Sequence, residues 1–196
     1  MKKGPTDKPT QKRKGIDVRK KGHRFERRLA KKFTTWDGSG RTFSSTRGSG
    51  AWDKAPGDLL RDERFPFLIE AKDHSIESGP DENGLTKKWW SIMELFSPKC
   101  KKPRMAGWWQ EARLEAEAAD KIPWLIFTSN YFPDFLVMEQ SVFNWILEHV
   151  PELDDVMYAK FTSSVLRGPT PTVMILLDPF LDRVSEQLLD DLFVED

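Results

Sequence analysis

The feature that most constrains the fold is an apolar run at residues 65–69 that ends in the charged triplet Glu70-Ala71-Lys72. The run Phe-Pro-Phe-Leu-Ile predicts a buried strand, and an unpaired charge at the end of such a strand would be costly to desolvate. Side chains two positions apart on a strand point to the same face. We therefore expect Glu70 and Lys72 to be presented together, with Ala71 turned to the other face.

A second short strand is predicted over residues 57–61, and it carries Asp58. The polar residues 62–64 between the two strands suit a turn. A hairpin folded about residue 64 places Asp58 opposite Glu70, and directly opposed residues have Cβ atoms roughly 4.5–5.5 Å apart. The expected hairpin therefore brings two carboxylates and one lysine to the same place.

Two carboxylates this close raise each other's pKa unless a cation lies between them. A few carboxylate oxygens with waters are the ligands that Mg²⁺ prefers, and Lys72 would suit a nucleophilic water or a developing phosphate charge. The same spacing also fits the end of a surface hairpin with a cross-strand ion pair, because structural ion pairs resemble sites. The spacing alone leaves both interpretations open.

A helix is predicted from near Gly22 to about Thr35. Apolar residues at helical spacing form its buried stripe, namely Phe25, Leu29, Phe33 and Trp36. The other side is basic, with Arg24, Arg27, Arg28, Lys31 and Lys32. At about 100° per residue, Glu26 falls within the buried stripe. A lone acid there needs a partner, which is either a nearby arginine or the cation that Asp58 and Glu70 would share.

Charge is distributed unevenly along the 196 residues, although the net charge is zero. Residues 1–32 hold fourteen Lys/Arg and three acidic residues, whereas residues 133–196 hold thirteen acidic residues and three Lys/Arg. We expect residues 1–20 to be a basic, disordered arm that binds a polyanion or is simply solvated. Residues 21–150 would form the core, and residues 151–196 an acidic extension that completes or covers it.

The single cysteine, Cys100, excludes an internal disulfide and fits a reducing compartment. The three histidines show no metal-ligand spacing. No apolar run approaches the roughly 18 residues that span a bilayer, and the basic N-terminus lacks the apolar region of a signal peptide. We therefore expect a soluble, cytoplasmic protein without a membrane partner, in the host cytoplasm if the protein is viral.

Two segments beside the hairpin are candidates for nucleic-acid contact. The loop at residues 37–56 contains Arg47-Gly48-Ser49-Gly50, whose glycines would let the backbone approach a phosphate while Arg and Ser donate hydrogen bonds. A plain flexible loop has the same composition. The insertion at residues 73–106 interleaves basic residues with Trp89 and Trp90, which suits a nucleic-acid surface but also a core or dimer contact.

The remaining elements follow from alternating apolar patterns. The predicted elements are an edge strand near 41–45, a helix over 107–120, strands at 122–128 and 135–138, a helix near 139–149, a strand at 173–177 and a last helix over 179–193. Such alternation predicts a mixed sheet with helices on both faces.

Taken in order, these features resemble the PD-(D/E)XK nuclease superfamily, and within it the archaeal-type and phage Holliday junction resolvases. The matching segments are Gly22-His23-Arg24-Phe25-Glu26-Arg27, Arg47-Gly48-Ser49-Gly50, Pro56-Gly57-Asp58 and Ile69-Glu70-Ala71-Lys72. The resemblance extends over about residues 20–130 and implies an α/β, restriction-endonuclease-like fold with a mixed central sheet flanked by helices. The long insertion and the acidic extension depart from the shorter resolvases and leave the DNA substrate open.

The resemblance also implies roles for individual residues. Asp58 and Glu70 would hold Mg²⁺ with the backbone carbonyl of Ala71, and Mn²⁺ could substitute. Glu26 would bind a second ion or a water on the metal. Lys72 would activate the attacking water, and Ser49 would act near the scissile phosphate. Contacts to DNA are implied for Arg24, Arg27, Lys31, Arg47 and Gln110.

The expected function is Mg²⁺-dependent cleavage of branched DNA by a Holliday junction resolvase, in DNA recombination or repair. Paired cuts in two strands imply a homodimer with two-fold symmetry, and the basic residues 12–32 should make DNA binding strongly salt-dependent. Two alternatives remain. One is another PD-(D/E)XK nuclease, of restriction or repair type, acting on linear or single-stranded DNA. The other is a non-catalytic nucleic-acid-binding protein on the same scaffold.

Overall fold

The computed structural model describes residues 18–46, 56–62, 64–74, 94–95, 100, 103–129, 132–164 and 169–193. Several sequence-based expectations lie outside the described residues, namely those for the arm up to residue 17 and for Arg47, Ser49, Trp89 and Trp90.

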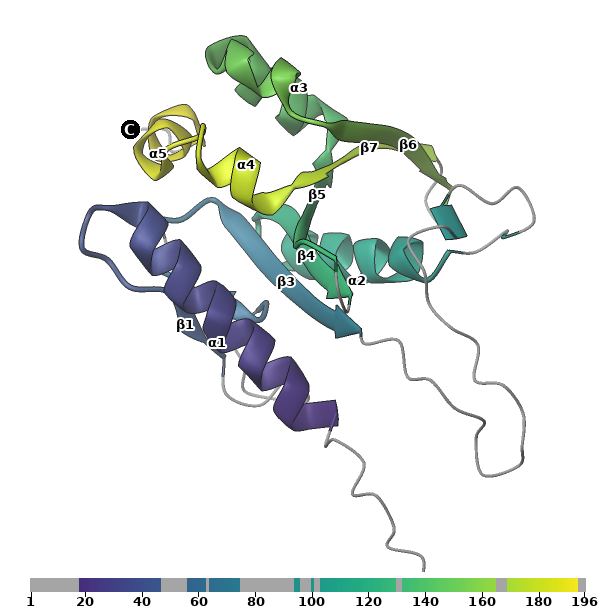
Figure 1. The fold of residues 1–196 in the computed structure, drawn as a ribbon, viewed down its shortest axis with the longest axis horizontal. Helices are drawn as coiled ribbons and strands as arrows, with labels where there is room; N and C mark the ends of the chain where they lie inside the picture. The colour runs from purple at the N-terminus through teal and green to yellow at the C-terminus, as the bar shows by residue number, and fades with distance from the viewer. Residues whose placement is uncertain are drawn as a thin grey trace, which may run out of the picture.

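In the described part of the chain, a mixed sheet of seven strands forms the centre of the molecule (Figure 1). Its strands are β1 (Ser44–Ser45), β2 (Leu59–Leu60), β3 (Phe67–His74), β4 (Ile122–Ser129), β5 (Phe135–Glu139), β6 (Tyr158–Ser164) and β7 (Pro169–Leu176). Their order across the sheet is β1-β2-β3-β4-β5-β7-β6. β3 and β4 run parallel, and the other neighbouring strands are antiparallel.

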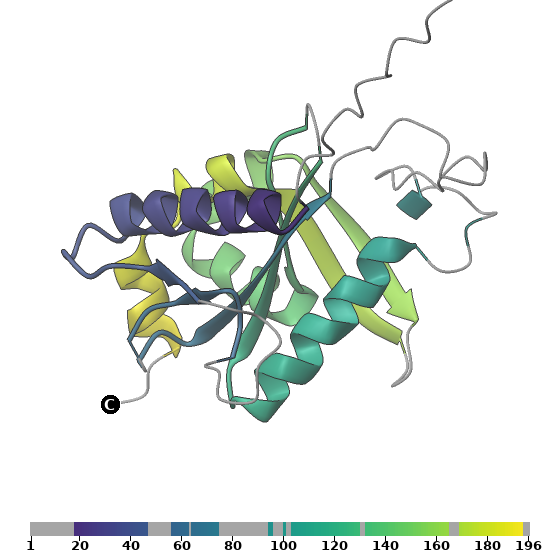
Figure 2. The same ribbon diagram turned by 90° about the horizontal axis from the view of Figure 1, so that it is seen from below.

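Helices cover both faces of this sheet, and Figure 2 shows α1 and α2 on opposite sides. The helices are α1 (Val18–Asp37), α2 (Arg104–Ala118), α3 (Gln140–His149), the 3-10 helix η2 (Pro151–Asp155), α4 (Leu177–Leu181) and α5 (Glu186–Phe193). This architecture confirms the expected α/β, restriction-endonuclease-like fold with a mixed central sheet. None of the described helices is long and apolar enough to cross a membrane.

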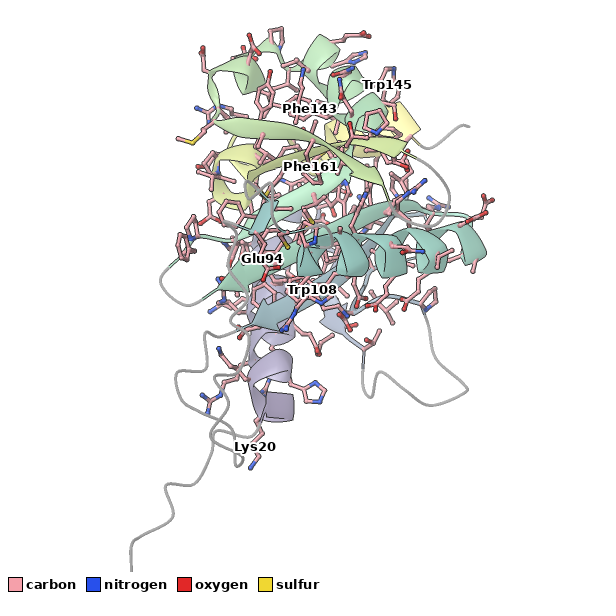
Figure 3. All side chains as sticks on the ribbon, turned by 90° about the vertical axis from the view of Figure 1, so that its right-hand side faces the viewer. Lys20, Glu94, Trp108, Phe143, Trp145 and Phe161 are labelled. Carbon is pink, nitrogen blue, oxygen red and sulfur yellow. The ribbon has the colours of Figure 1, made fainter. Side chains whose placement is uncertain are left out.

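Alternating side chains of the central strands supply two apolar clusters, one on each face of the sheet. On β4, Trp124 and Ile126 join the cluster that includes side chains of α1, α3, α4 and α5. Leu125 and Phe127 join the cluster beneath α2, together with Trp108 of that helix (Figure 3). The sheet is therefore buried on both faces, and the helices are held to it by apolar packing.

α1 starts at Val18, one turn earlier than expected, and buries the predicted stripe. Phe25, Leu29 and Phe33 are at most 3% exposed. Glu26 is also buried, as the helical wheel predicted. Figure 3 shows Lys20 at the N-terminal end of this helix, beyond the layered core.

The basic side of α1 is divided between paired and exposed residues. Arg28 donates two hydrogen bonds of 2.7 Å to the carboxylate of Asp134, which lies between β4 and β5. Lys32 lies 3.4 Å from the same carboxylate and also contacts Asp178 of α4. These two basic residues fasten α1 to the rest of the fold, although half of the Arg28 side chain stays exposed. Arg24, Arg27 and Lys31 are exposed as well, without an ion pair to another element among the described residues.

β2 and β3 pair in the predicted register. Leu59 lies opposite Ile69, which is the pairing of a hairpin folded about residue 64. The turn is stabilised by Asp62, whose Oδ1 accepts the Arg64 N–H at 3.1 Å. Because turn type and loop length fix the register of a hairpin, the register of β2 and β3 was predictable from the sequence.

A buried group of charges joins α5 to this hairpin, and we call it the arginine cluster (Asp37, Arg41, Arg61, Glu186 and Asp190). The Arg61 side chain is fully buried, contacts Glu186, and places Nη2 2.9 Å from Asp190 Oδ2. Arg41 Nη2 lies 2.7 Å from Glu186 Oε1 and 3.0 Å from Asp190 Oδ2. Asp37 Oδ2 lies 3.6 Å from Arg61 Nη1. The acidic C-terminal helix thus packs against β1 and β2 through two arginines.

The C-terminal part differs from the sequence-based expectations in three ways. Residues 158–164 form the edge strand β6, which their mostly polar sequence did not indicate. The last strand, β7, begins at Pro169 and not near residue 173. The single helix expected over 179–193 is two helices, α4 and α5. The break occurs because the Ser185 hydroxyl accepts the Leu188 N–H at 3.2 Å and so caps a new helix.

Candidate active site

A close backbone approach at Gly57 sets the position of Asp58. Gly57 has a φ of 80°, which residues with a Cβ rarely adopt. A Cβ at this position would lie 3.0 Å from the carbonyl oxygen of Ile69. The Asp58 N–H donates to that same oxygen at 2.8 Å. Glycine therefore lets the incoming chain approach β3 immediately before Asp58.

The Asp58 carboxylate continues the strand pairing where the regular backbone ladder stops. Its Oδ2 accepts the N–H of Ala71 at 2.9 Å, and the residue is only 7% exposed. β2 and β3 pair at Leu59 and Ile69, and the negative charge of Asp58 acts on Glu70, so the two carboxylates lie near each other.

Glu70 and Lys72 lie on the face of β3 that is turned to α2, whereas Ala71 packs in the core on the α1 side. Lys72 Nζ contacts Glu70 Oε1. Burial and the negative charge of Asp58 raise the pKa of Glu70 from 4.5 to about 7, although Lys72 acts in the opposite direction. Burial lowers the pKa of Lys72, but the nearby carboxylates, led by Glu70, raise it overall. Lys72 is therefore cationic, and it compensates the two carboxylates only in part.

Two carboxylates of α2 that the sequence pattern did not indicate also face this pair. Glu111 Oε2 lies 3.8 Å from Lys72 Nζ. Glu115, one helical turn later, contributes to the raised pKa of Glu70. Their spacing of four residues puts both on one side of the helix. That spacing could have suggested a pair, but only the packing of α2 against β3 reveals which side faces Lys72.

Glu26 approaches from α1, on the other face of the sheet. Its Oε2 lies 3.0 Å from His23 Nδ1, so its observed partner is a histidine and not an arginine. α1 packs against β3, and an ion pair of 3.2 Å between Lys21 and Asp73 holds the start of the helix beside the end of that strand. Among the described residues, no contact joins Glu26 to the hairpin carboxylates.

The residues expected to contact DNA are dispersed. Arg24, Arg27 and Lys31 are exposed on α1, and Arg27 Nε donates to the backbone oxygen of His23 at 3.0 Å. Gln110 lines a surface cavity formed by α2, the start of β4 and the start of α3. The structure therefore does not bring Gln110 to Lys72.

The donor set at Asp58 and Glu70 suits a hard divalent cation. Two buried carboxylates lie close together, and a bound cation would offset their repulsion. Within the described ranges, no three Asp, Glu, His or Cys side chains are close enough to hold a metal ion by themselves. Further ligands would therefore be waters or main-chain oxygens. Mg²⁺ commonly binds through one or two carboxylates and keeps several waters, which agrees with this arrangement.

Comparison with known proteins identifies the family. Residues 17–190 match the model of the family described as Phage putative PDDEXK endonuclease, and this range includes every described strand together with α1 to α4. No match was found among curated proteins or among solved structures. The match supports the PD-(D/E)XK resemblance without extending it to Holliday junction resolvases. The chain belongs to this phage endonuclease family and is a nuclease of the PD-(D/E)XK type.

Proposed function

We propose that the protein is a divalent-metal-dependent endodeoxyribonuclease that uses Mg²⁺, with Mn²⁺ able to substitute. One observation carries the proposal. Asp58 is fixed on the Ala71 N–H at 2.9 Å and faces Glu70, whose carboxylate contacts Lys72. Two acids that can hold a metal ion, beside a lysine that can face the phosphate, suit metal-assisted hydrolysis.

Each side chain has a separate task in this proposal. Asp58 and Glu70, with the carbonyl of Ala71, would hold the cation, and Glu26 would bind a second ion or a water on the metal. The cation supplies Lewis-acid stabilisation and a more acidic water. Lys72 orients that water and offsets the negative charge that develops on the phosphate. The Ala71 N–H is bonded to Asp58, and the N–H and carbonyl of one strand residue point to the same side, which supports this role of the carbonyl.

The reaction is hydrolysis of a phosphodiester. A water oxygen attacks phosphorus in line with the leaving oxygen, and the bond between phosphorus and that bridging oxygen breaks. The attacking water gives up a proton, and the leaving oxygen gains one to become a hydroxyl group. Ser49, which lies outside the described residues, is proposed to act near the scissile phosphate.

For the substrate we propose branched DNA, with a four-way junction as the preferred form. The support is the likeness of the ordered motifs to Holliday junction resolvases, which also implies a homodimer that makes paired cuts. Arg24, Arg27 and Lys31, exposed on α1, are proposed to bind phosphates, together with Arg47. Gln110 belongs to this proposal only if DNA extends to the cavity beside α2. A cytoplasmic location, in the host cell for a phage protein, completes the proposal.

The decisive experiment compares Asp58→Asn with the unmodified protein on four-way junctions, flaps, linear duplex and single strands, with and without Mg²⁺. We expect Asp58→Asn to abolish cleavage while junction binding is nearly unchanged. Asp155→Asn is the control, because it removes an exposed acid from η2, outside the hairpin. Cleavage that persists in pure Asp58→Asn would exclude Asp58 from the site. Equal cleavage of all duplex forms would exclude the junction preference but not the nuclease.

A further inference from the structure

We propose that Glu111 is a positioning residue that receives the Lys72 ammonium when Glu70 binds a divalent cation. This inference rests on the proposed function, because it concerns the same metal site. In the structure, Lys72 Nζ contacts Glu70 Oε1 and lies 3.8 Å from Glu111 Oε2. Lys72 is thus already positioned between the two carboxylates.

Lys72 and a bound cation would compete for the carboxylate of Glu70. Glu70 Oε1 accepts a hydrogen bond from the Lys72 ammonium. The proposed site requires the same carboxylate to bind a divalent cation. A divalent cation and an ammonium group on one carboxylate repel each other. Cation binding must therefore displace Lys72 Nζ from Glu70 or weaken the contact.

The displaced ammonium of Lys72 needs another carboxylate to accept its hydrogen bond. Asp58 already uses Oδ2 to accept the Ala71 N–H, and the proposal assigns the rest of that carboxylate to the cation. Glu111 is 63% exposed at its side chain and Lys72 is 24% exposed. Because Lys72 Nζ and Glu111 Oε2 are already only 3.8 Å apart, a small displacement of the ammonium brings it to Glu111.

Glu111 and Glu115 differ in how they interact with the site. Glu115 acts on Glu70 through its charge, but the ion pair of Lys72 on α2 is with Glu111. Removing either acid removes one negative charge near the metal site. Only the loss of Glu111 removes a carboxylate that Lys72 can reach, so only that effect should depend on the presence of Lys72.

The test is Mn²⁺ binding to the full chain, measured by titration calorimetry at fixed ionic strength. The variants are Glu111→Gln, Lys72→Met, their combination, and Glu115→Gln with and without Lys72→Met. We expect Glu111→Gln to raise the Mn²⁺ dissociation constant by up to about fivefold, the range of an exposed ion pair. This effect should disappear when Lys72→Met is also present, whereas any effect of Glu115→Gln should persist.

The outcomes separate the two proposals. If the unmodified protein binds Mn²⁺ but Glu111→Gln leaves the dissociation constant unchanged, the role of Glu111 is wrong and the metal site stands. An equal effect of Glu111→Gln with and without Lys72 would also overturn the inference, since it would reveal only a general charge effect. If Asp58→Asn and the unmodified protein both fail to bind Mn²⁺, the proposed function itself fails. Thermal unfolding of each variant confirms that it is folded.

Discussion

The same β2–β3 hairpin contacts two buried groups of charges that look alike but are built differently. In the arginine cluster, the Arg61 side chain is fully buried, and its guanidinium is surrounded by Asp37, Glu186 and Asp190. In the candidate active site, Lys72 faces Asp58 and Glu70 and remains partly exposed. α5 closes the first group, whereas the second opens toward Glu111 on the surface of α2.

A raised carboxyl pKa does not distinguish the two groups. Burial and a hydrogen bond with Asp190 raise the pKa of Glu186 to about 7, although Arg61 acts in the opposite direction. Glu70 reaches the same value through burial and the charge of Asp58. The difference lies in the cation. A planar, multiply bonded arginine suits a fixed structural pair, and a single mobile ammonium suits a site whose charges must rearrange. A perturbed pKa therefore indicates a functional site only where a ligand can reach it.

The largest effect should come from the arginine cluster, as a loss of stability. Arg61→Met would leave Glu186 and Asp190 with one arginine fewer, and breaking a buried ion pair costs about 3–5 kcal/mol of unfolding free energy. Urea denaturation followed by tryptophan fluorescence measures the change. Arg64→Met, at an exposed position on the same hairpin, should stay close to the unmodified protein. A loss below about 1 kcal/mol, the range of a surface pair, would contradict a structural role for Arg61.

The second effect should be on activity and not on stability. Lys72→Met would remove the charge that faces the developing phosphate charge, and losing one such group typically slows the chemical step by about 100–1000-fold. Single-turnover cleavage with saturating Mg²⁺ measures the rate. Lys160→Met, on the exposed face of β6, is the control. An unchanged rate in Lys72→Met would mean that the lysine belongs to a structural pair like that of Arg61.

The third effect is a dependence of the unfolding free energy on pH, through the carboxyls of the two groups. A carboxyl with a raised pKa in the folded state contributes stability that is fully present below its unfolded pKa and is lost as pH rises through the folded value. For Glu70 and Glu186 this window runs from 4.5 to about 7. We expect unfolding free energy to fall across that window, and Glu70→Gln and Glu186→Gln each to reduce the fall.

Metal should then separate the two groups. Mn²⁺ added at pH 8 or so should restore the stability lost at Glu70, because binding to the folded state stabilises it. It should restore nothing at Glu186, which the arginines already surround. Urea denaturation at several pH values, with and without Mn²⁺, measures both contributions. The same response to Mn²⁺ in Glu70→Gln and in the unmodified protein would contradict the assignment of Glu70 to the metal.

The smallest effect concerns α1, which also contrasts fixed and available charges. Arg28 is held by two hydrogen bonds to Asp134, whereas Arg24 and Lys31 are exposed. In a plot of log affinity for DNA against log salt, each phosphate contact contributes a slope of about −0.9. Arg24→Ala with Lys31→Ala should therefore make the slope less negative, by about 1.8 for two lost phosphate contacts. Arg28→Ala should lower stability and leave the slope unchanged. The reverse result would place DNA on the Arg28 side.

Local patterns predicted a large part of the fold and of the site. The register of β2 and β3, with Leu59 opposite Ile69, followed from one turn and the two-residue period of strands, because both act over a few residues. The burial of Glu26 followed from the helical period. β6 was missed because its sequence is mostly polar and its position at the sheet edge needs few apolar residues.

The sequence by itself determined which residues the hairpin presents: Glu70 and Lys72 on one face, with Asp58 opposite. It also determined that the chain is α/β, because alternating helix and strand patterns permit few other arrangements. Only the tertiary structure decided the partners of those charges. Glu111 reaches Lys72, and Glu186 reaches Arg61 across 125 residues, because packed elements bring them together. Such contacts depend on how whole helices lie on the sheet, and no local period in the chain encodes that arrangement.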